Sequence, residues 1–241
     1  MIAVILAAGT GTRLRPLTEK IPKTLLKIND VTLLERFVKE LVNNDVNSFI
    51  FVVGHYKEKV EVCGKELSEK YNVNINIVEN KQYDTTNTSC SAYLVSKALD
   101  DDFILINGDN VLDPEIIKKI TENKHSSMII DNYKQLNEES FKLIIKEGNI
   151  QDIGKNLNVK ESFGEFIGVS KVIKSDLKDF NEILLQLIKE DPQNYYDFAY
   201  KELSKRTKID FILTNGLKWT EIDDHDDWEC AKELINEFEN K

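Results

Sequence analysis

The sequence Ile2-Ala-Val-Ile-Leu-Ala-Ala-Gly-Thr-Gly-Thr-Arg13 joins a short apolar run to a glycine-containing loop. The run is rich in β-branched residues, which is typical of a buried strand of a parallel sheet. Ligands of open α/β sheets bind beyond the carboxyl ends of the strands. Glycines and small residues in such a loop let backbone N–H groups approach an anion closely. The segment therefore predicts an anion-binding loop at the edge of a parallel sheet.

Strand and helix patterns alternate through the first half of the chain. Thr32 with Glu35 forms a capping-box pattern, and Asp113 followed by Pro114 is typical of a helix start. The spacing predicts further strands at 49–53, 73–78 and 103–106, and helices at 33–41, 56–71, 88–99 and 114–124. This alternation predicts an α/β fold with a Rossmann-like, mostly parallel central sheet flanked by helices.

The second half changes character, with shorter strands of which some are expected to be antiparallel. Strands are predicted at 128–131, 141–145, 149–153, 165–172, 209–213 and 219–222, and helices at 176–190, 195–205 and 225–239. No linker rich in serine, glycine or proline separates the halves, so we expect a single domain over residues 1–241.

The chain has 241 residues and a formal net charge of −10, which argues against a general nucleic-acid binder. Residues 1–29 are the exception, with five basic residues against one acidic residue, Glu19. This contrast favours a small anionic ligand near the N-terminus. Three scattered cysteines and the lack of a long apolar run predict a cytoplasmic protein without a membrane span. The sequence does not distinguish a monomer from a homodimer.

Three anion-binding motifs compete for the glycine loop. A dinucleotide fingerprint would need glycine where Leu14 stands, and a P-loop would need Gly-Lys-Ser/Thr, which is absent. The segment Leu6-Ala-Ala-Gly-Thr-Gly-Thr-Arg-Leu-Arg-Pro-Leu-Thr18, followed by Pro22-Lys-Thr-Leu-Leu-Lys-Ile28, resembles the sugar-phosphate nucleotidyltransferase family. The resemblance implies that residues 1–125 mainly bind the nucleotide and residues 126–241 mainly bind the acceptor. It implies Arg13 and Lys23 as catalytic cations, and a nucleotide-binding loop of Leu6, Ala7, Ala8, Gly9, Thr10, Gly11 and Thr12.

Two acidic segments are candidates for a magnesium site. Asn107-Gly108-Asp109 follows the predicted strand 103–106, and by spacing alone Asp109 could equally form an Asx turn. Family members carry a metal-binding aspartate at this Gly-Asp, which implies that Asn107 and Gly108 contact the nucleotide and that Asp109 is catalytic. Asp223 matches the late metal ligand of the family, while Asp224 is expected to cap the closing helix. The resemblance therefore implies Mg²⁺ held by Asp109 and Asp223.

Polar side chains around residues 79–91 are candidates for contacts with the base, because amides and hydroxyls can pair with a base edge. The candidate contacts are Glu79, Asn87, Thr88, Ser89 and Ser91. Helix capping is the alternative for Asn87 or Thr88, and one side chain could serve both roles. The stretch Asn87-Thr-Ser-Cys-Ser-Ala-Tyr-Leu94 is similar to bacterial phosphocholine cytidylyltransferases, which favours CTP.

The acceptor contacts rest on similar segments. Tyr195-Tyr-Asp-Phe198 and Phe163-Gly-Glu-Phe-Ile-Gly-Val-Ser170 resemble acceptor-binding segments of the small cytidylyltransferases. The candidates are Tyr133, Glu165, Tyr195, Tyr196 and Asp197, since acids and aromatic rings suit a cationic amine. For Tyr196, packing in the core is an equal alternative.

Most of the chain resembles the small bacterial cytidylyltransferase branch, and especially phosphoglutamine cytidylyltransferases of capsule phosphoramidate synthesis. This implies an enzyme that transfers CMP from CTP to the phosphate of a small phosphorylated acceptor, with L-glutamine phosphate as the first expectation. Phosphocholine, phosphoethanolamine and a sugar 1-phosphate are alternative acceptors. A non-catalytic module that senses nucleotides is an alternative outside the enzymes.

Overall fold

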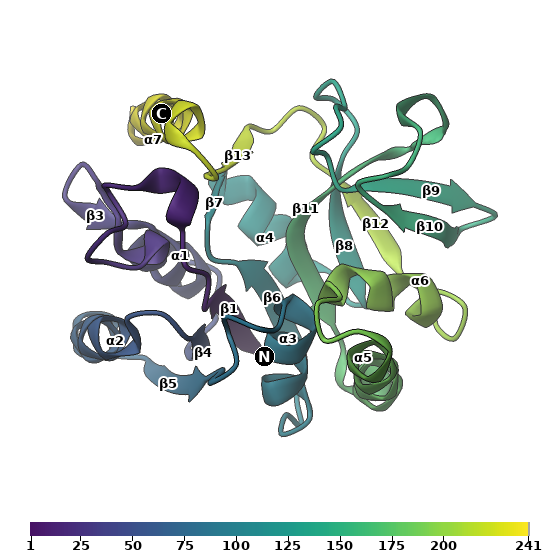
Figure 1. Cartoon of the computed structure of the whole chain (residues 1–241), viewed down its shortest axis with the longest axis horizontal. Helices are drawn as coiled ribbons and strands as arrows, with labels where there is room; N and C mark the ends of the chain where they lie inside the picture. The colour runs from purple at the N-terminus through teal and green to yellow at the C-terminus, as the bar shows by residue number, and fades with distance from the viewer. Residues whose placement is uncertain (241) are drawn as a thin grey trace.

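The computed structural model describes residues 1–240 of the chain. Its central sheet has nine strands, in the order β10-β9-β11-β6-β1-β4-β5, and β8 pairs with both β11 and β12 (Figure 1). The strands of this sheet are β1 Ile2–Ala7, β4 Ser48–Val53, β5 Asn74–Glu79, β6 Phe103–Asn107, β8 Ser127–Asp131, β9 Lys142–Lys146, β10 Asn149–Gly154, β11 Gly164–Val172 and β12 Asp210–Leu213.

Strand direction divides the sheet as the sequence predicts. The neighbours β6, β1, β4 and β5 are all parallel, and Ile5 of β1 lies between Phe51 of β4 and Ile106 of β6. Strand β11 is antiparallel to β6 and to β8, whereas β12 is parallel to β8. The α/β fold with a mostly parallel central sheet is thus confirmed, and the antiparallel pairs occur in the second half.

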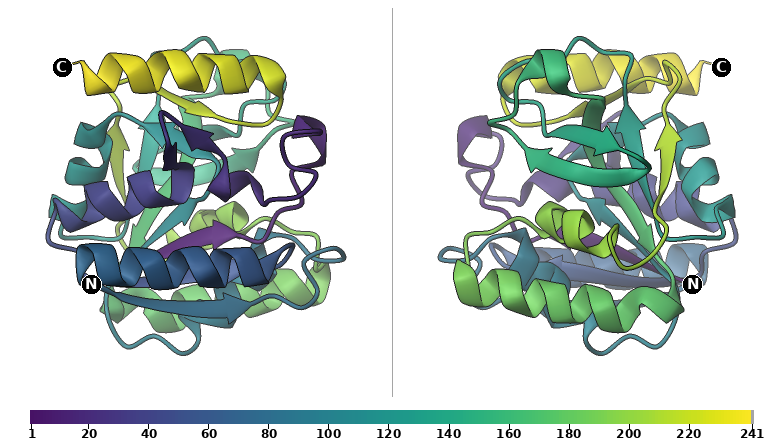
Figure 2. Two further views of the ribbon diagram at one scale, coloured as in Figure 1. Left: turned by 90° about the vertical axis from the view of Figure 1, so that its left-hand side faces the viewer. Right: turned by 90° about the vertical axis from the view of Figure 1, so that its right-hand side faces the viewer.

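Helices cover both faces of the sheet. On one face lie α1 Leu33–Val42, α2 Lys57–Tyr71 and α4 Pro114–Glu122, and on the other lie α3 Thr88–Ser96, α5 Leu177–Glu190 and α6 Ala199–Leu203. The closing helix α7 His225–Glu239 lies at one end of the molecule, and α5 lies near the opposite end (Figure 2).

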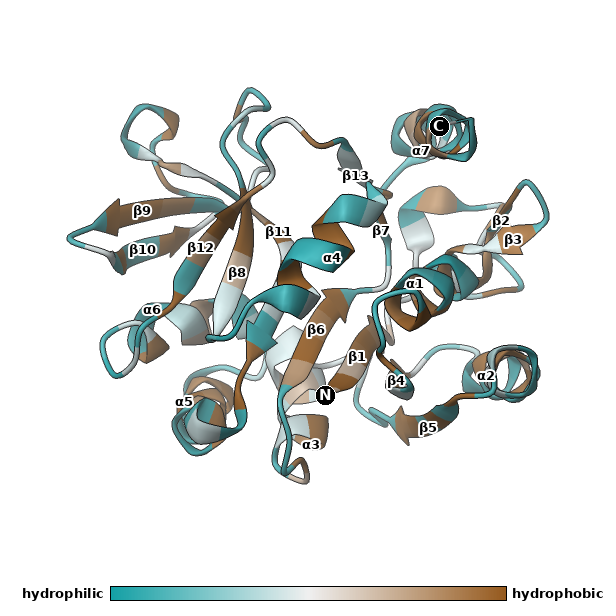
Figure 3. Ribbon diagram, turned by 180° about the vertical axis from the view of Figure 1, so that it is seen from behind, coloured by the Kyte–Doolittle hydropathy of each residue, from teal (hydrophilic) through white to brown (hydrophobic). Residues whose placement is uncertain are grey.

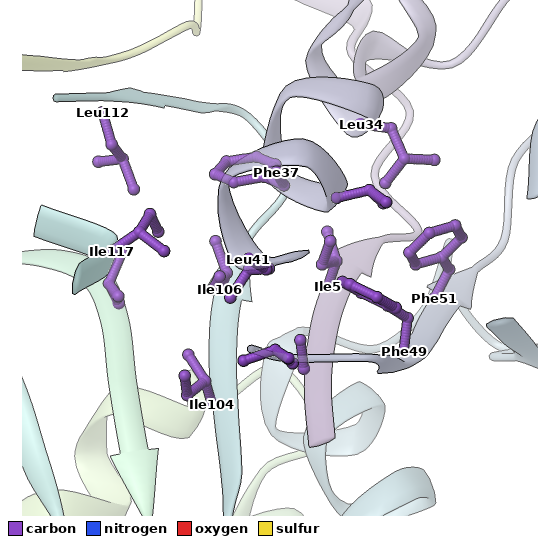
Figure 4. Packing of buried hydrophobic residues seen from close by; sticks show 14 of the residues in the cluster. Ile5, Leu34, Phe37, Leu41, Phe49, Phe51, Ile104, Ile106, Leu112 and Ile117 are labelled. Atoms are coloured by element: carbon purple, nitrogen blue, oxygen red, sulfur yellow. The ribbon is translucent and has the colours of Figure 1, made fainter. Parts of the chain in front are cut away.

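The two faces have separate hydrophobic cores because successive strand residues point to opposite sides. On β1, Ala3 and Ile5 join the core beneath α1, whereas Val4 joins the core beneath α3 and α5. Figure 4 shows Leu34, Phe37 and other side chains of the first core packed over the strands. The central strands are mainly hydrophobic, and hydrophilic residues gather on the outer helices (Figure 3).

Local capping explains several helix starts. The Asp113 side chain accepts from the Glu115 amide, with Pro114 in the first turn. Thr32 accepts from the Glu35 amide, but the Glu35 carboxylate bonds Lys70 and Tyr71 instead of completing the predicted capping box. A full capping box occurs at α7, between Asp224 and Asp227.

Short elements account for the differences from the predicted pattern. Strands β2 Lys27–Ile28 and β3 Val31–Thr32 form a hairpin, and β7 Asn110–Leu112 pairs with β13 Trp219–Glu221. β2, β3 and β7 were not predicted because two or three residues carry no periodicity. The predicted helix at 195–205 is divided into a 3₁₀ turn at Tyr196–Phe198 and α6.

No helix within residues 1–240 is long and apolar enough to cross a membrane. Cys63, Cys90 and Cys230 are free thiols, as their spacing predicts.

Candidate active site

The glycine loop leaves β1 at the carboxyl edge of the sheet and enters a 3₁₀ turn at Thr12–Leu14. Gly11 has φ +61°, a conformation that L side chains rarely adopt, and its carbonyl accepts from the Thr18 hydroxyl at 2.6 Å. A Cβ on Gly9 would meet no atom within 4 Å, so this part of the backbone faces open space. The loop therefore presents its backbone to a cleft while Leu14 anchors it in the core.

Lys23 lies at the centre of a charged cluster. Its Nζ is 3.0 Å from Oδ2 of Asp109 and 3.2 Å from Oδ1 of Asp223. Arg13 reaches the same Asp223 oxygen, with its guanidinium nitrogen at 2.8 Å. The structure thus brings together all four side chains that the sequence analysis assigned to catalysis and metal binding.

Two tertiary features create this convergence. Gly108 packs against the end of β1, where its amide donates to the Leu6 carbonyl at 2.9 Å and a Cβ would lie 2.6 Å from that same oxygen. Strand β13 pairs with β7, and the Ile222 amide donates to the Asp109 carbonyl at 3.0 Å. These contacts hold Asp223 beside Asp109, although the two residues lie far apart in the sequence.

The cluster shifts the pKa values of its own members. Burial lowers the pKa of Lys23, but the charges of Asp109 and Asp223 outweigh it, so the pKa lies above its ordinary value. Burial raises the pKa of Asp223, but Lys23 and Arg13 bring it below the usual range. Lys23 and Asp223 are therefore both charged at neutral pH.

Glu221 is a third carboxylate in this cluster. One ligand atom from each of Asp109, Glu221 and Asp223 can be chosen so that all lie within 4.8 Å of one another. Partial desolvation raises the pKa of Glu221, and the negative charges of Asp109 and Asp223 raise it further. Three converging carboxylates fit a hard divalent cation, which prefers oxygen ligands.

A cleft of about 320 Å³ extends from this cluster in both directions. The predicted residues Leu6, Ala8, Gly9, Arg13, Asn107, Gly108 and Asp109 line its middle. Ala7, Gly11 and Lys23 line a smaller cavity of about 80 Å³ behind the loop. Thr10 and Thr12 belong to the loop but line neither space.

At one end, the cleft reaches the region between β5 and α3. Asn87 lines it and caps α3 by accepting from the Thr88 amide, so the capping alternative is confirmed for this residue. Ser89 is fully buried and does not line the cleft. Glu79 also lies outside the cleft lining and forms an ion pair with Lys57 at 2.7 Å.

At the other end, the cleft reaches the antiparallel strands of the second half. Oε1 of Glu165 accepts from the Phe141 amide at 3.2 Å, whereas Oε2 is buried and has no hydrogen-bond partner among residues 1–240. Burial raises the pKa of Glu165, and burial also raises the pKa of Asp197 to about 7. Both side chains line the cleft and are costly to ionise without a cationic partner.

Two further predicted acceptor contacts lie elsewhere. Tyr196 is completely buried in the core, where its hydroxyl donates to Oδ1 of Asn107 at 3.3 Å. Tyr196 therefore supports the cleft from beneath instead of lining it. Tyr133 is 79% exposed, packs near Gly216 and does not line the cleft.

Several side chains in the cleft were not predicted from the sequence. Glu221 could have been found, because it is an acidic residue only two positions before the predicted metal ligand Asp223. Phe166 lies within β11. The other such residues lie in loops or next to strand ends, whose position only the tertiary structure defines: Asn80, Tyr83, Thr86, Glu139, Phe141 and Lys155.

This combination of a glycine loop, a basic pair and converging carboxylates at the carboxyl edge of a parallel sheet agrees with the sequence comparison. Residues 2–157 match the Nucleotidyl transferase family, and the chain belongs to it.

Among individual relatives, the chain is 30% identical over 238 residues to the bifunctional IPC transferase and DIPP synthase of Aquifex aeolicus. That match covers 97% of this chain and 51% of the relative. The chain is also 41% identical over 112 residues to the choline-phosphate cytidylyltransferase of Streptococcus pneumoniae, a match that covers 46% of each protein. These matches span about half the length of the two relatives.

A solved structure of CTP:phosphocholine cytidylyltransferase from Streptococcus pneumoniae is similar throughout. The TM-score is 0.79 at 27% identity, with 97% of this chain and 99% of that chain covered.

Proposed function

We propose that this protein is a cytidylyltransferase that transfers CMP from CTP to the phosphate of a small phosphorylated acceptor. The observation that carries the proposal is the contact of Lys23 with both Asp109 and Asp223 beside the glycine loop. Family membership and the similarity to a CTP-using enzyme support it.

Asp109, Asp223 and Glu221 are the residues that would hold a metal ion, and we propose Mg²⁺. When bound, the ion would neutralise charge on the phosphates of the nucleotide. The fit rests on the oxygen-only ligand set and on the mutual distances of its atoms.

The chain's own residues then supply position and charge. In the proposed reaction, an oxygen of the acceptor phosphate attacks the α-phosphorus of CTP in line. The bond from that phosphorus to the bridging oxygen breaks, and pyrophosphate leaves. A terminal phosphate group is largely ionised at pH 7, so no strong general base is needed. Lys23 stabilises the charge that develops at the α-phosphate, and Arg13 holds the departing phosphates.

For the acceptor, we propose L-glutamine phosphate. Its ammonium group would meet the carboxylates of Glu165 and Asp197, whose burial makes a cationic partner favourable. Its carboxylate would meet Lys155, which lines the same end of the cleft and is 2.9 Å from Glu139. The two carboxylates and the lysine match an acceptor that carries both charges. A role in capsule phosphoramidate synthesis stays a prediction of the sequence resemblance.

Phosphocholine is the second candidate acceptor, and a specific observation favours it. The rings of Phe141, Tyr195 and Phe198 form a cluster with centroid separations of 5.5, 5.7 and 6.0 Å, and Phe141 and Tyr195 line the cleft. Aromatic faces attract quaternary ammonium groups.

Pyrophosphate release tests the proposal directly. The protein with Mg²⁺ is offered each nucleoside triphosphate in turn with L-glutamine phosphate, phosphocholine, phosphoethanolamine or a hexose 1-phosphate. We expect release with CTP and an amine-bearing acceptor. Tight binding of CTP without turnover for any of these acceptors would instead support a nucleotide-sensing module.

A further inference from the structure

We propose that Asn80 sets the base specificity of the cleft by making the Ser91 hydroxyl a hydrogen-bond donor toward the base. This inference rests on the proposed function and concerns how the site would distinguish cytosine from uracil and thymine. Neither residue belongs to the charged cluster that would perform the transfer.

Asn80 is a buried amide whose orientation is determined by the backbone. It follows β5 directly, is 3% exposed and donates its backbone amide to the Val53 carbonyl at 2.8 Å. Its side-chain Oδ1 accepts from the Gln82 amide at 3.0 Å. Since an amide has its oxygen and nitrogen on opposite sides, the NH₂ group must point the other way. It donates to the hydroxyls of Thr86 and Ser91, both at 3.1 Å.

These two bonds determine what each hydroxyl can still offer. Thr86 accepts from Asn80 and donates its proton to the Gln82 carbonyl at 2.7 Å, so it offers a lone pair to a ligand. Ser91 accepts from Asn80, which leaves its own proton to be donated. Both residues line the cleft at the end between β5 and α3. The cleft wall therefore presents a donor at Ser91 next to an acceptor at Thr86.

This pair of groups complements one kind of pyrimidine edge. Cytosine has an acceptor at N3 beside the donor NH₂ group at N4, whereas uracil and thymine have a donor at N3 beside an acceptor at O4. A hydroxyl that is forced to donate matches N3 of cytosine and opposes the N3–H of the other two. A substrate that leaves buried polar groups of the site without a hydrogen-bond partner is rejected strongly in favour of one that pairs them.

Asn80→Asp tests the proposal because it reverses the polarity while preserving the size of the side chain. The carboxylate still accepts from the Gln82 amide, but it also accepts the protons of the hydroxyls, so Ser91 then offers lone pairs to the base. We expect the ratio of kcat/KM for CTP to that for UTP to fall at least tenfold. Ser91→Ala removes the donor, and we expect about a tenfold fall in the same ratio, mainly through CTP. The exposed residue Asn236 on α7 provides the charge-matched control, Asn236→Asp, which should keep the wild-type ratio.

Dissociation constants for CTP and UTP, measured without acceptor, separate this proposal from the proposed function. A wild-type protein that prefers UTP would overturn the inference, as would Asn80→Asp and Ser91→Ala variants that both keep the wild-type preference. If Asn80→Asp melts at a much lower temperature than the wild type, the CTP-to-UTP preference of Ser91→Ala alone decides. A wild type that binds CTP selectively but releases no pyrophosphate with any acceptor would refute the proposed transfer reaction. The CTP-to-UTP ratios of dissociation constants for Asn80→Asp and Ser91→Ala would still test the role of Asn80.

Discussion

The ammonium of Lys23 lies 3.0 Å from the carboxylate of Asp109, across 86 positions of sequence. Lys23 begins a short 3₁₀ turn after the glycine loop, and Asp109 follows the buried strand β6. Their contact joins the basic N-terminal segment to the acidic remainder of the chain. It places a positive charge at the point where the proposed reaction develops negative charge.

Replacing Lys23 tests this arrangement. Lys23→Met should lower kcat by about two to three orders of magnitude, because one preorganised donor to a transition-state oxyanion contributes that much. Pyrophosphate release measures the effect, and circular dichroism verifies the fold. The exposed Lys27 provides a matched control, Lys27→Met, which should keep near-normal turnover. Near-normal turnover of Lys23→Met would refute the assigned role.

Neighbouring aspartates separate metal binding from helix capping. Asp223→Asn should weaken Mn²⁺ binding at least tenfold and lower turnover, because it removes one of three converging carboxylates. Asp224 caps α7 through its side chain, and asparagine preserves that cap, so Asp224→Asn should bind Mn²⁺ as the wild type does. Titration calorimetry measures both. Equal Mn²⁺ affinity for the two variants would rule out Asp223 as a ligand.

Chelation provides a test without mutation. Excess EDTA should abolish pyrophosphate release, and added Mg²⁺ should restore it, since the carboxylate cluster fits a hard divalent cation. Undiminished release in EDTA would contradict the proposed metal requirement.

Asp197 should make the stability of the protein depend on pH. Burial raises its pKa from 3.8 to about 7, so the folded protein holds a proton that the unfolded chain has lost. Stability contributed by this group is therefore complete below about pH 4 and is lost as the pH rises through 7. Asp197→Asn should match the wild type at pH 4 and be more stable at pH 8 by about 2–4 kcal/mol.

Denaturant unfolding at several pH values measures this difference. The 88% exposed side chain of Asp100 provides the control, Asp100→Asn, whose stability should follow the wild-type pH profile. A difference in the free energy of unfolding between Asp197→Asn and wild type that stays constant from pH 4 to pH 8 would show that Asp197 titrates normally.

Glu165 and Tyr133 are both acceptor candidates from the sequence, but the structure places them differently. Glu165→Gln should raise KM for an amine-bearing acceptor about tenfold and leave KM for CTP unchanged. The substitution removes the negative charge of a carboxylate whose buried Oε2 has no hydrogen-bond partner within residues 1–240. Tyr133→Phe should change neither constant, because its ring lies outside the cleft. Steady-state kinetics with each substrate varied in turn tests both. A changed acceptor KM for Tyr133→Phe alone would reverse this assignment.

Local patterns in the sequence predicted much of the fold. The run Ile2–Leu6 predicted a buried strand because continuous apolar residues suit a strand covered on both faces. The Asp113-Pro114 pair predicted a helix start, since its backbone groups are satisfied within one turn. The predicted base contacts at Glu79 and Ser89 do not line the cleft, because Glu79 forms an ion pair with Lys57 and Ser89 is completely buried. A local sequence pattern shows neither the ion pair nor the burial.

The sequence by itself determined which chemical groups the protein has and the short-range elements that carry them. It placed the glycine loop after β1, Asp109 after β6 and the cap of α7 at Asp224, all of which depend on neighbours within a few residues. The family resemblance predicted that Asp223 meets Asp109, but only the tertiary structure decided that Glu221 joins them. The pairing of β13 with β7 creates that contact, and β7 is three residues long. Such a strand forms only when distant segments pack together, because its few hydrogen bonds cannot offset the entropy of ordering it alone.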